Sequence, residues 1–494
     1  MTRNRYAEHL GSVFHGSWDR TAVVDAESGL SWSYRDLLGQ MRGFRHKLMA
    51  LGIKRGDRII TVMDNSVELL VMYFAVALCG AAIVPIDPLR GERDIRDMVT
   101  ETDGKLIIVS DRHWNTYGTC THILSSGFRL CSDRGASGSE AVKIFREIDC
   151  ESDFLITYTS GSEGRAKGVV HTFHNLCASA DAFRSRFGFG PPNVFYHSLP
   201  MAYMAGILNL IVLPMISGST IILGNRFNAV SATNYWEFPV AFGVNTFWFT
   251  PTMLAMLLKL DRGRDGRRLS ERGEVIGCVG TAPLGCQTKE GFSGEYGIRL
   301  YESYGLSETL FISTEYPGLD AKPASVGKPL SGVRIRVGSD SELMLAADWM
   351  FTRYLGDSNQ AVFDGEYFQS GDLGCIDNKG RMYITGRKKD VIIKGGMNIS
   401  PRRIEEFIRS LHRLNELVIV GIPDDTLGER IVCFYLGKKG GGRVLREVNS
   451  ELVRGLGRDY SVDEFVHVGE IPRTINGKVD KKSLIQRYRK GDDN

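Results

Sequence analysis

The stretch at residues 69–86 contains 18 residues without a charged side chain, and it strongly constrains the possible folds. A helix that spans a membrane needs about 20 mostly apolar residues, so the length alone would allow one. Gly80 and Pro85 interrupt the stretch, however, and small residues cluster at its centre. We therefore expect a buried helix to about Leu78, a glycine turn and a short buried strand, and no membrane span.

Short apolar stretches alternate with helical patterns over most of the chain. Four stretches that are typical of buried strands are residues 58–63, 106–109, 154–158 and 219–223. Alternation of strands and helices predicts an α/β fold with largely parallel sheets. Because 494 residues exceed what one hydrophobic core usually serves, we expect more than one domain.

The pattern changes near residue 387, where residues 386–390 read G-R-K-K-D. Pro401 begins a predicted helix, since proline is favoured in a first helical turn, and residues 417–422 and 431–436 have the composition of strands. Residues 478–490 are basic, and we expect them to form a solvated last helix. The sequence thus predicts a second, smaller α+β domain after a charged linker.

The bulk composition disfavours several classes of protein. The net charge of +3 is small for 494 residues, so we expect no nucleic-acid partner. Nine cysteines form no C-x-x-C pair, which indicates reduced thiols in a cytoplasmic protein rather than disulfides or a zinc site. The first residues carry no apolar stretch behind their charges, so we expect no secretory signal.

Residues 158–168 read Y-T-S-G-S-E-G-R-A-K-G, a predicted turn rich in glycine and hydroxyl groups. Backbone N–H groups of such a turn can surround phosphate oxygens, and Lys167 can add a positive charge. The stretch is not a Walker A loop, because Ala166 and Gly168 occupy the positions of that motif's second glycine and its hydroxyl. Taken alone, it leaves phosphate binding and an ordinary surface turn open.

Four more motifs follow in order, namely Y-G-L-S-E-T at 304–309, S-G-D-L-G at 370–374, G-R-K-K-D-V-I-I-K-G-G at 386–396 and P-R-T-I-N-G-K at 472–478. Together with the turn, this set resembles the adenylate-forming superfamily of acyl-CoA synthetases, non-ribosomal peptide adenylation domains and firefly-type luciferases. The resemblance covers nearly the whole chain.

The resemblance implies a domain organisation in the α/β class. Residues 1–386 would form a large N-terminal domain of layered α/β subdomains plus a small β-barrel-like subdomain. Residues 387–390 would form a hinge, with Lys389 at the hinge position. Residues 391–494 would form a small mobile α+β domain that rotates between two half-reactions, a domain alternation.

The resemblance also implies ATP-dependent activation of a carboxylic acid to an acyl-adenylate, with release of pyrophosphate and with Mg²⁺ as cofactor. Because a carboxylate must attack a negatively charged phosphate, fixed positive charge would lower the barrier. Lys478 matches the catalytic lysine, and Glu308 matches the magnesium ligand, a hard oxygen donor for a hard cation. The other matches to nucleotide-binding positions are Thr159, Ser160, Gly161, Ser162, Gly164, Lys167, Gly280, Thr281, Ala282, Pro283, Tyr304, Gly305, Ser307, Asp372 and Arg387.

Three segments depart from the family pattern. Glu163 and Ala166 replace the usual threonine and proline of the phosphate loop, and Tyr203 replaces the histidine of L-P-x-x-H-x-x-G. Residues 460–463 read Y-S-V-D where Y-K-x-P is common. We expect Glu163 to point to solvent at the tip of the loop; the alternative is a role in holding magnesium or in releasing pyrophosphate.

The acid is expected to have an uncharged tail, because no aspartate follows the L-P motif to hold an α-ammonium group. The predicted pocket walls are mostly apolar, as ligand pockets usually are. They suit a compact aromatic, an alicyclic or a medium aliphatic acid. The predicted walls are Tyr203, Met204, Trp248 and Phe249, with Thr281 beside them.

The acceptor of the acyl group stays open at this point. Gly395-Gly396 leaves room for the pantetheine arm of CoA, whereas N-G-K-V-D-K-K-S-L at 476–484 resembles peptide-synthetase adenylation domains. No carrier-type attachment motif follows, so the candidates are the thiol of CoA or of a separate carrier protein, or an amine such as an amino acid. The amine would imply a stand-alone amide ligase of the coronafacate-ligase type, an enzyme of secondary metabolism.

An alternative function, from a different class of protein, is a nucleotide-binding scaffold without catalysis, in which Glu163 has disabled triphosphate binding. The presence of Lys478, Glu308 and Asp372 argues against this reading, because a scaffold has no need of a catalytic set.

Overall fold

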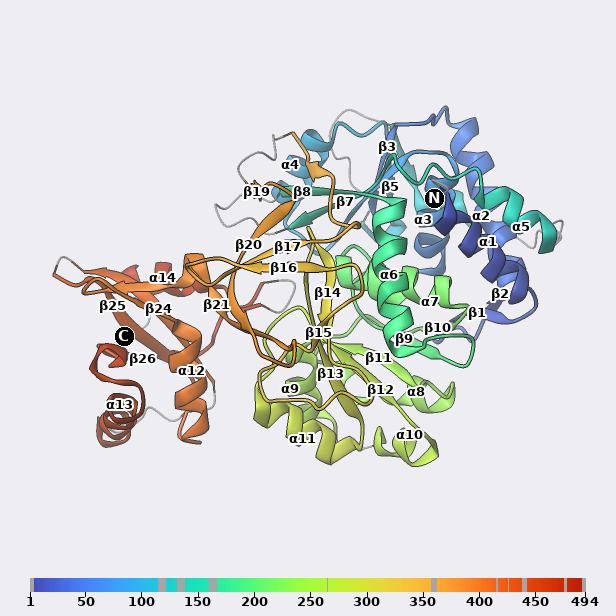
Figure 1. The fold of residues 1–494 in the computed structure, drawn as a ribbon. Helices are drawn as coiled ribbons and strands as arrows, with labels where there is room; N and C mark the ends of the chain where they lie inside the picture. Colours follow the sequence, from blue (N-terminus) through green and yellow to red (C-terminus); the bar gives the residue numbers. More distant parts are fainter. Residues whose placement is uncertain are drawn as a thin grey trace. The chain divides into compact units, whose positions relative to one another are not determined.

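The computed structural model describes residues 4–113, 121–130, 138–159, 167–263, 265–356, 362–414, 416–424, 426–437, 442–474 and 478–490. The chain divides into two compact units (Figure 1). The first unit comprises Met1–Arg334 and Ala346–Glu366, and the second comprises Ile335–Leu345 and Tyr367–Asn494. Each unit has its own hydrophobic core and is described by itself.

In the described part of the first unit, seven strands form a sheet in the order β18-β8-β7-β4-β3-β5-β6. Neighbouring strands from β7 to β6 run parallel, whereas β8 is antiparallel to both β7 and β18. The strands are β3 (Arg58–Val62), β4 (Ala82–Ile86), β5 (Leu106–Val109), β6 (Thr121–Leu124), β7 (Asp153–Thr159), β8 (Lys167–Thr172) and β18 (Arg353–Tyr354).

Nine further strands within the described ranges of this unit form a second sheet, in the order β15-β14-β13-β12-β11-β9-β10-β1-β2. Its middle, from β13 to β1, is parallel, and the outer pairs are antiparallel. The strands are β1 (Thr21–Asp25), β2 (Ser31–Ser33), β9 (Val194–His197), β10 (Thr220–Leu223), β11 (Thr246–Phe249), β12 (Ile276–Val279), β13 (Arg299–Leu306), β14 (Leu310–Thr314) and β15 (Lys328–Pro329). A short strand, β19 (Phe363–Asp364), lies near the end of the unit.

Helices of the first unit fall between these strands along the chain. Several begin at side-chain caps: Ser33 and Asp36 form a capping box on α2, and Thr172 and Asn175 form one on α6. The helices are α1 (Arg5–Gly16), α2 (Tyr34–Ala50), α3 (Val67–Leu78), α4 (Glu92–Thr102), α5 (Gly138–Phe145), α6 (Phe173–Phe187), a π-helix (Ala205–Val212), α7 (Leu213–Ser217), α8 (Glu237–Ala241), α9 (Pro251–Leu260), α10 (Arg267–Arg272) and α11 (Cys286–Tyr296), with short 3₁₀ turns at Asp111–His113, Ser125–Phe128 and Ser231–Thr233.

The uncharged stretch at 69–86 folds as the sequence predicts. The Ser66 hydroxyl caps α3 by accepting a 3.1 Å hydrogen bond from the Leu69 amide, and every residue of the helix except Glu68 is buried. Gly80 turns the chain with a φ of +64°, a conformation that glycine adopts without strain, and β4 follows. Among the residues that the structure describes, we find no helix of the length and apolar character that a membrane crossing requires.

The second unit combines two sets of strands with three helices in its described residues. In the first set β17 and β21 both pair with β20, and in the second the order is β23-β22-β25-β24, with β26 beside β25. The elements are β16 (Arg334–Val337), β17 (Glu342–Ala346), β20 (Tyr367–Ile376), β21 (Met382–Arg387), a 3₁₀ turn η6 (Lys388–Asp390), β22 (Ile392–Lys394), β23 (Met397–Ile399), α12 (Pro401–Ser410), β24 (Leu417–Asp424), β25 (Gly428–Tyr435), α13 (Gly442–Leu456), a 3₁₀ turn (Arg458–Tyr460), β26 (Glu464–His467) and α14 (Lys481–Lys490).

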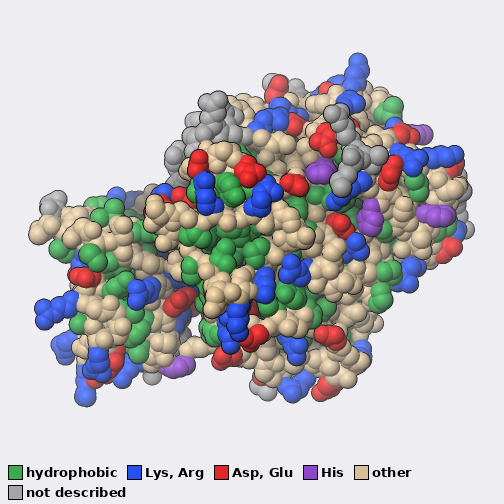
Figure 2. All heavy atoms as spheres, viewed as in Figure 1, with side chains coloured by type: hydrophobic (Ala, Val, Ile, Leu, Met, Phe, Trp, Pro, Cys, Tyr) green, Lys and Arg blue, Asp and Glu red, His purple; other side chains and the backbone are tan. Residues whose placement is uncertain are grey.

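The predicted fold class is confirmed, since the chain has a large α/β part followed by a small α+β part. The predicted helix at Pro401 and the two predicted strands after it are α12, β24 and β25. The exact place of the hinge, at 387–390, stays a prediction. On the face shown in Figure 2, acidic and basic side chains are interspersed.

Candidate active site

Neighbouring parallel strands of the nine-stranded sheet carry the predicted site residues at their carboxyl ends. Strands β11, β12 and β13 lie side by side (Figure 1), with Phe249 paired to Val279 and Val279 to Glu302. Ligands of open α/β sheets bind outside the carboxyl ends of parallel strands. The topology therefore brings five predicted groups to one edge of this sheet: Tyr203-Met204 after β9, Trp248 in β11, Gly280-Thr281-Ala282-Pro283 after β12, Tyr304-Gly305 in β13, and Ser307-Glu308 after it.

The predicted phosphate loop joins β7 to β8. Thr159 and Lys167 face each other across the two strands, and the Thr159 hydroxyl donates to the Lys167 carbonyl oxygen at 3.4 Å. The tip, with Ser160, Gly161, Ser162 and Gly164 and with Glu163, lies outside the described residues. Within the described residues, the base of the loop thus presents the positive charge of Lys167.

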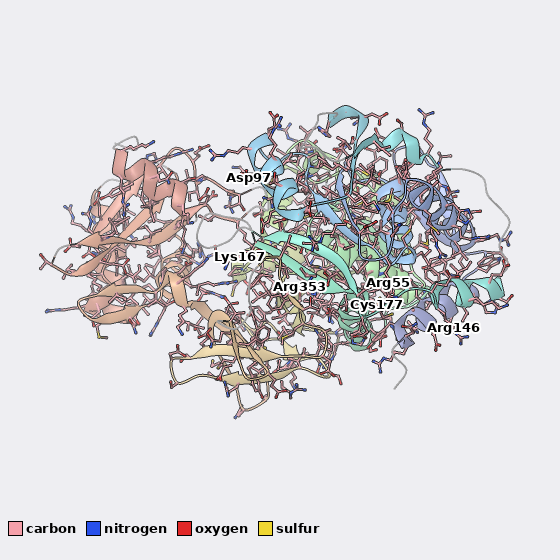
Figure 3. All side chains as sticks on the ribbon, turned by 90° about the horizontal axis from the view of Figure 1, so that it is seen from above. Arg55, Asp97, Arg146, Lys167, Cys177 and Arg353 are labelled. Carbon is pink, nitrogen blue, oxygen red and sulfur yellow. The ribbon has the colours of Figure 1, made fainter. Side chains whose placement is uncertain are left out.

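Tyr354 connects Lys167 with Glu308. The Lys167 ammonium nitrogen lies 5.3 Å from the centre of the Tyr354 ring, within the range of a cation–π contact. The hydroxyl of the same tyrosine donates a 2.9 Å hydrogen bond to Oε1 of Glu308. Tyr354 itself is held because its neighbour Arg353 donates to Asp153 of β7 at 2.8 Å, and Figure 3 shows Lys167 and Arg353 on adjoining parts of the unit.

The turn that carries Glu308 is held by its backbone. The Phe351 amide donates to the Glu308 carbonyl oxygen at 2.8 Å, and Nε2 of His171 donates to the Ser307 carbonyl oxygen at 2.7 Å. Burial lowers the pKa of His171 to about 4, so the ring is neutral near pH 7 and keeps one N–H for this bond. Gly305 is required just before the turn, because a Cβ there would lie 1.9 Å from the Leu310 carbonyl oxygen.

Glu308 fits the predicted role of magnesium ligand. It offers one half-buried carboxylate, of which Tyr354 engages Oε1. A single carboxylate suits Mg²⁺, which proteins commonly hold through one or two carboxylates together with substrate phosphates.

Thr281 has a backbone φ of +76°. A β-branched residue rarely adopts this conformation. Gly280 before it is buried, and a Cβ on Gly280 would lie 3.0 Å from the Ser303 hydroxyl oxygen. Local strain thus lies at the carboxyl end of β12, where the predicted adenine and acyl contacts meet.

The loop with Tyr203 and Met204 is held by the half-buried side chain of Asn65. Asn65 donates to the Leu199 carbonyl oxygen at 2.7 Å and accepts from the Met201 amide at 2.8 Å. Gly206 closes the loop, since a Cβ there would lie 2.0 Å from the Pro200 carbonyl oxygen. Burial raises the pKa of Tyr203 to about 12, so this side chain stays neutral where the family pattern has a titratable histidine.

Trp248 and Phe249 point to opposite faces of the nine-stranded sheet, as successive residues of a strand do. The Trp248 ring lies 5.3 Å from the rings of both Phe183 and Phe311. The Phe249 ring lies 5.2 Å from Phe292 of α11, in a core cluster on the other face. The two side chains therefore cannot line the same wall of a pocket.

The remaining predicted residues belong to the second unit. Asp372 is 2% exposed and faces Arg387 across β20 and β21, with 2.5 Å between Oδ1 and Nε. Lys389 lies in the 3₁₀ turn η6, and the next residue, Asp390, forms a 3.0 Å ion pair with Lys481 at the start of α14.

Lys478 is exposed at the base of a hairpin. Its carbonyl oxygen accepts a 2.7 Å hydrogen bond from the Thr474 amide, and Arg473 pairs with Val479. Residues 475–477 lie outside the described residues.

Four residues that support the site were missed from the sequence, namely Tyr354, His171, Asn65 and Tyr73, whose hydroxyl donates to the Met201 carbonyl oxygen at 2.6 Å. Each acts on a partner at least 46 residues away along the chain. Such contacts follow from the topology and leave no spacing pattern in the sequence.

Comparisons with known proteins agree with this picture. The family model described as AMP-binding enzyme matches residues 13–349, and the one described as AMP-binding enzyme C-terminal domain matches residues 403–478. The sulfoacetate–CoA ligase of Cupriavidus necator is 25% identical over 509 aligned residues, which cover 96% of each chain. The long-chain-fatty-acid–CoA ligase FadD13 of Mycobacterium tuberculosis is 26% identical over 502, covering 94% of this chain and 95% of its own.

The fold also matches a solved structure, that of ATP-bound MatB from Rhodopseudomonas palustris. The TM-score is 0.84 at 24% identity, with 98% of this chain and 99% of that chain covered. The resemblance indicated by the five motifs is confirmed, and the chain belongs to the AMP-binding enzyme family.

Proposed function

We propose that this protein is an AMP-forming acid–thiol ligase. It activates a carboxylic acid with ATP, releases pyrophosphate, and passes the acyl group from the adenylate to the thiol of CoA. Family membership supports the first half-reaction, and the two CoA ligases among its relatives support the second. The observation that carries the proposal is that Tyr354, at the base of the phosphate loop, contacts both Glu308 through its hydroxyl and Lys167 through its ring.

The residues of the first unit act on the triphosphate in this proposal. Lys167, with Thr159 and the loop residues Ser160, Gly161, Ser162 and Gly164, binds the β- and γ-phosphates. Glu308 would hold Mg²⁺, which supplies charge neutralisation when bound. Tyr304 and the segment Gly280–Pro283 with Ser307 bind the adenine and border the acyl group. In the second unit, Asp372 and Arg387 bind the ribose.

Lys478 is the proposed catalytic residue. Its ammonium group would contact the attacking carboxylate and the α-phosphate, where negative charge gathers in the transition state. Exposure of this lysine at an ordered hairpin base is compatible with that role. Rotation at Lys389 would then withdraw it before the thiol attacks.

The proposed substrate is a compact aromatic, alicyclic or medium aliphatic acid with an uncharged tail. Neutral Tyr203 and the buried side chains of Met204 and Trp248 support this choice, because none of them carries a charge that would offset that of a charged tail.

The thiol of CoA is the preferred acceptor. Residues 460–463 read Y-S-V-D in place of the common Y-K-x-P, and two of them make structural contacts within the second unit. Asp463 accepts 2.7 Å hydrogen bonds from both Lys394 and the Ile431 amide, and Lys394 also donates to the Ser461 carbonyl oxygen at 3.1 Å. These bonds connect the segment to β22 and β25, so Ser461 and Asp463 have a structural role within the unit that does not depend on the acceptor. We also propose a cytoplasmic location, where reduced thiols are the norm; the seven cysteines in the described residues are free.

The test is ATP- and acid-dependent release of pyrophosphate over a broad panel of acids. CoA, a carrier protein and a mixture of amino acids are then supplied in competition, and the acyl product is identified by mass. An acyl-CoA product confirms the proposal, and an amide would assign the amine instead. Nucleotide binding without pyrophosphate release from any acid would favour a scaffold.

A further inference from the structure

Glu342 lies at the start of β17 and holds two separate segments of the second unit with its two carboxylate oxygens. The residue is 7% exposed. Its Oε1 atom accepts a 3.0 Å hydrogen bond from the Gly371 amide, and its Oε2 atom forms a 2.8 Å ion pair with the Lys388 ammonium group. Burial of a carboxylate is costly unless it is paired and hydrogen-bonded, so these two contacts stabilise its charge.

Each of the two held segments carries one member of the proposed ribose pair. Gly371 directly precedes Asp372, and Lys388 directly follows Arg387. Asp372 and Arg387 face each other across β20 and β21, with 2.5 Å between Oδ1 and Nε. The contacts therefore form a closed ring: Glu342 joins the two segments at one side, and the ribose pair joins them at the other.

Further hydrogen bonds fix the first segment of this ring. Gly371 has a φ of +67°, a conformation that glycine adopts without strain, and its amide reaches Glu342 in this conformation. The Ser370 hydroxyl donates to the Leu343 carbonyl oxygen at 2.5 Å and accepts from the Asp372 amide at 3.0 Å. The segment with Asp372 is thus fastened to β17 by two side chains, those of Ser370 and Glu342.

The second segment leads into the proposed hinge. Lys388 begins the 3₁₀ turn η6 and directly precedes Lys389. Its ammonium group also contacts Oδ2 of Asp340 at 2.7 Å, but that carboxylate is half exposed, and ion pairs at the surface contribute little. Glu342 is therefore the more buried of the two anchors for the residue before the hinge.

We propose that Glu342 is a positioning residue that couples the ribose site to the hinge. A ribose bound by Asp372 and Arg387 fixes the ring, and the fixed ring holds Lys388, so that the torsional change is confined to Lys389. Without the contact between Glu342 and Lys388, the change spreads backward along the chain and disturbs Arg387. This inference rests on the proposed function, which assigns the ribose pair and the hinge, and it adds the connection between them.

Two substitutions break the same contact with opposite changes of charge. Glu342→Gln keeps an oxygen for the Gly371 amide but places an NH2 group, which cannot accept a hydrogen bond, against Lys388. Lys388→Met removes the cation and keeps the carboxylate. A double variant shows whether the two act through one contact. Lys379→Met is the matched control, because it removes an exposed lysine from the turn between β20 and β21, outside the ring.

The first readout is the affinity for AMP divided by the affinity for 2′,3′-dideoxy-AMP, both measured by calorimetry without any acid. The two nucleotides carry the same phosphate charge, so the ratio reports the ribose contacts alone. We expect a ratio of about ten or more in wild type and Lys379→Met, since the analogue lacks the hydroxyl groups that bond to charged side chains. The ratio should fall to about three or less in Glu342→Gln and Lys388→Met, and no further in the double variant.

The second readout is the rate at which trypsin cleaves after Lys389, with and without saturating AMP. Cleavage requires local opening of the chain, and a ligand that is coupled to the hinge changes how often the hinge opens. We expect AMP to slow this cleavage by about fivefold or more in wild type and Lys379→Met, and by less than about twofold in Glu342→Gln and Lys388→Met.

The outcomes separate this inference from the proposed function, because neither readout needs a substrate acid. Loss of the ribose preference and of the protection by AMP in both variants, without further loss in the double variant, supports the inference even if no acid releases pyrophosphate. A preference or protection that survives in either variant, additive losses, or a wild type that shows neither effect overturns the inference, and pyrophosphate release then still decides the ligase proposal.

A further variant keeps the inference testable if Glu342→Gln does not fold. Lys388→Arg keeps a cation opposite Glu342 and is expected to match wild type in the affinity ratio, whereas Lys388→Met loses the ribose preference. Equal ratios in Lys388→Arg and Lys388→Met would overturn the inference.

Discussion

The hydroxyl of Tyr354 donates a 2.9 Å hydrogen bond to Oε1 of Glu308, 46 residues away along the chain. Burial, and then the adjacent Glu308 carboxylate, raise the pKa of Tyr354, so its hydroxyl keeps the proton and remains a donor at physiological pH. Lys167 lies over the face of the same ring. One tyrosine thus positions both the proposed magnesium ligand and the proposed phosphate-binding cation.

Tyr354→Phe is expected to lower kcat/KM for ATP by about tenfold and to raise the Mg²⁺ concentration needed for half-maximal rate, since a hydrogen bond to a charged group is lost. Steady-state kinetics over a Mg²⁺ titration measure both. Tyr158→Phe is the control, because the Tyr158 hydroxyl bonds Thr102 at 2.9 Å, away from Glu308. Equal Mg²⁺ dependence in the two variants would contradict this role for Tyr354.

Lys478→Ala is expected to reduce adenylate formation by at least about a hundredfold, because a positive charge at the reacting phosphate is lost. Tm should change little, since the side chain is exposed. Pyrophosphate exchange measures the first half-reaction alone, and Lys490→Ala, an exposed lysine of α14, is the matched control. Near-normal exchange in Lys478→Ala would remove this lysine from the catalytic role.

Lys389→Pro is expected to spare pyrophosphate exchange and to slow acyl transfer to the thiol by about tenfold or more, because proline fixes φ at the proposed hinge. Lys389→Ala keeps the torsional freedom and should behave like wild type in both steps. Equal loss of the two half-reactions in Lys389→Pro would place the hinge elsewhere.

Thr281→Gly is expected to raise the free energy of unfolding by about 1 kcal/mol, since glycine adopts a φ of +76° without strain. Tm is therefore expected to rise, while KM for the acid changes, because the side chain beside the proposed acyl contacts is lost. Ala282→Gly is the control at an exposed neighbour without positive φ. A fall in Tm in Thr281→Gly would show that the threonine side chain stabilises the turn.

Lys289 of α11 binds two carboxylates, Glu302 at 2.9 Å and Glu315 at 2.7 Å, and Glu315 is 1% exposed. Burial lowers the pKa of Lys289, and the two carboxylates together outweigh this and raise the pKa above the ordinary 10.5. Lys289→Met is expected to lower the free energy of unfolding by about 3 kcal/mol near pH 7, because two buried carboxylates lose their cation.

The pH dependence of this ion cluster has a definite sign. The pKa of Lys289 is higher in the folded protein than in the unfolded chain, so the protonated lysine stabilises the fold fully below pH 10.5. This stabilisation is lost as the pH rises through the folded-state pKa. The difference in unfolding free energy between wild type and Lys289→Met should therefore shrink in strongly alkaline buffer. Denaturant titrations at pH 7, 9 and about 11 measure it; a difference that grows with pH would contradict the assignment.

The sequence predicted the elements better than the contacts between them. Gly80 and Pro85 sufficed to turn an apparent membrane segment into α3, a turn and β4, because these residues act on their own backbone. Tyr354 was missed because its role depends on β18 pairing with β8, which lies more than 180 residues earlier in the chain. The opposite directions of Trp248 and Phe249, in contrast, follow from strand alternation and were predictable once β11 was recognised.

The ion pair between Asp390 and Lys481 has a consequence for the movement of the catalytic lysine. Asp390 directly follows the proposed hinge residue Lys389, and Lys481 lies three residues after Lys478. The ion pair therefore connects the residue after the proposed hinge to the segment that carries Lys478. Along the chain, Lys478 lies 88 positions after Asp390. A torsional change at Lys389 would therefore displace Lys478 directly, without first deforming the sheet between them.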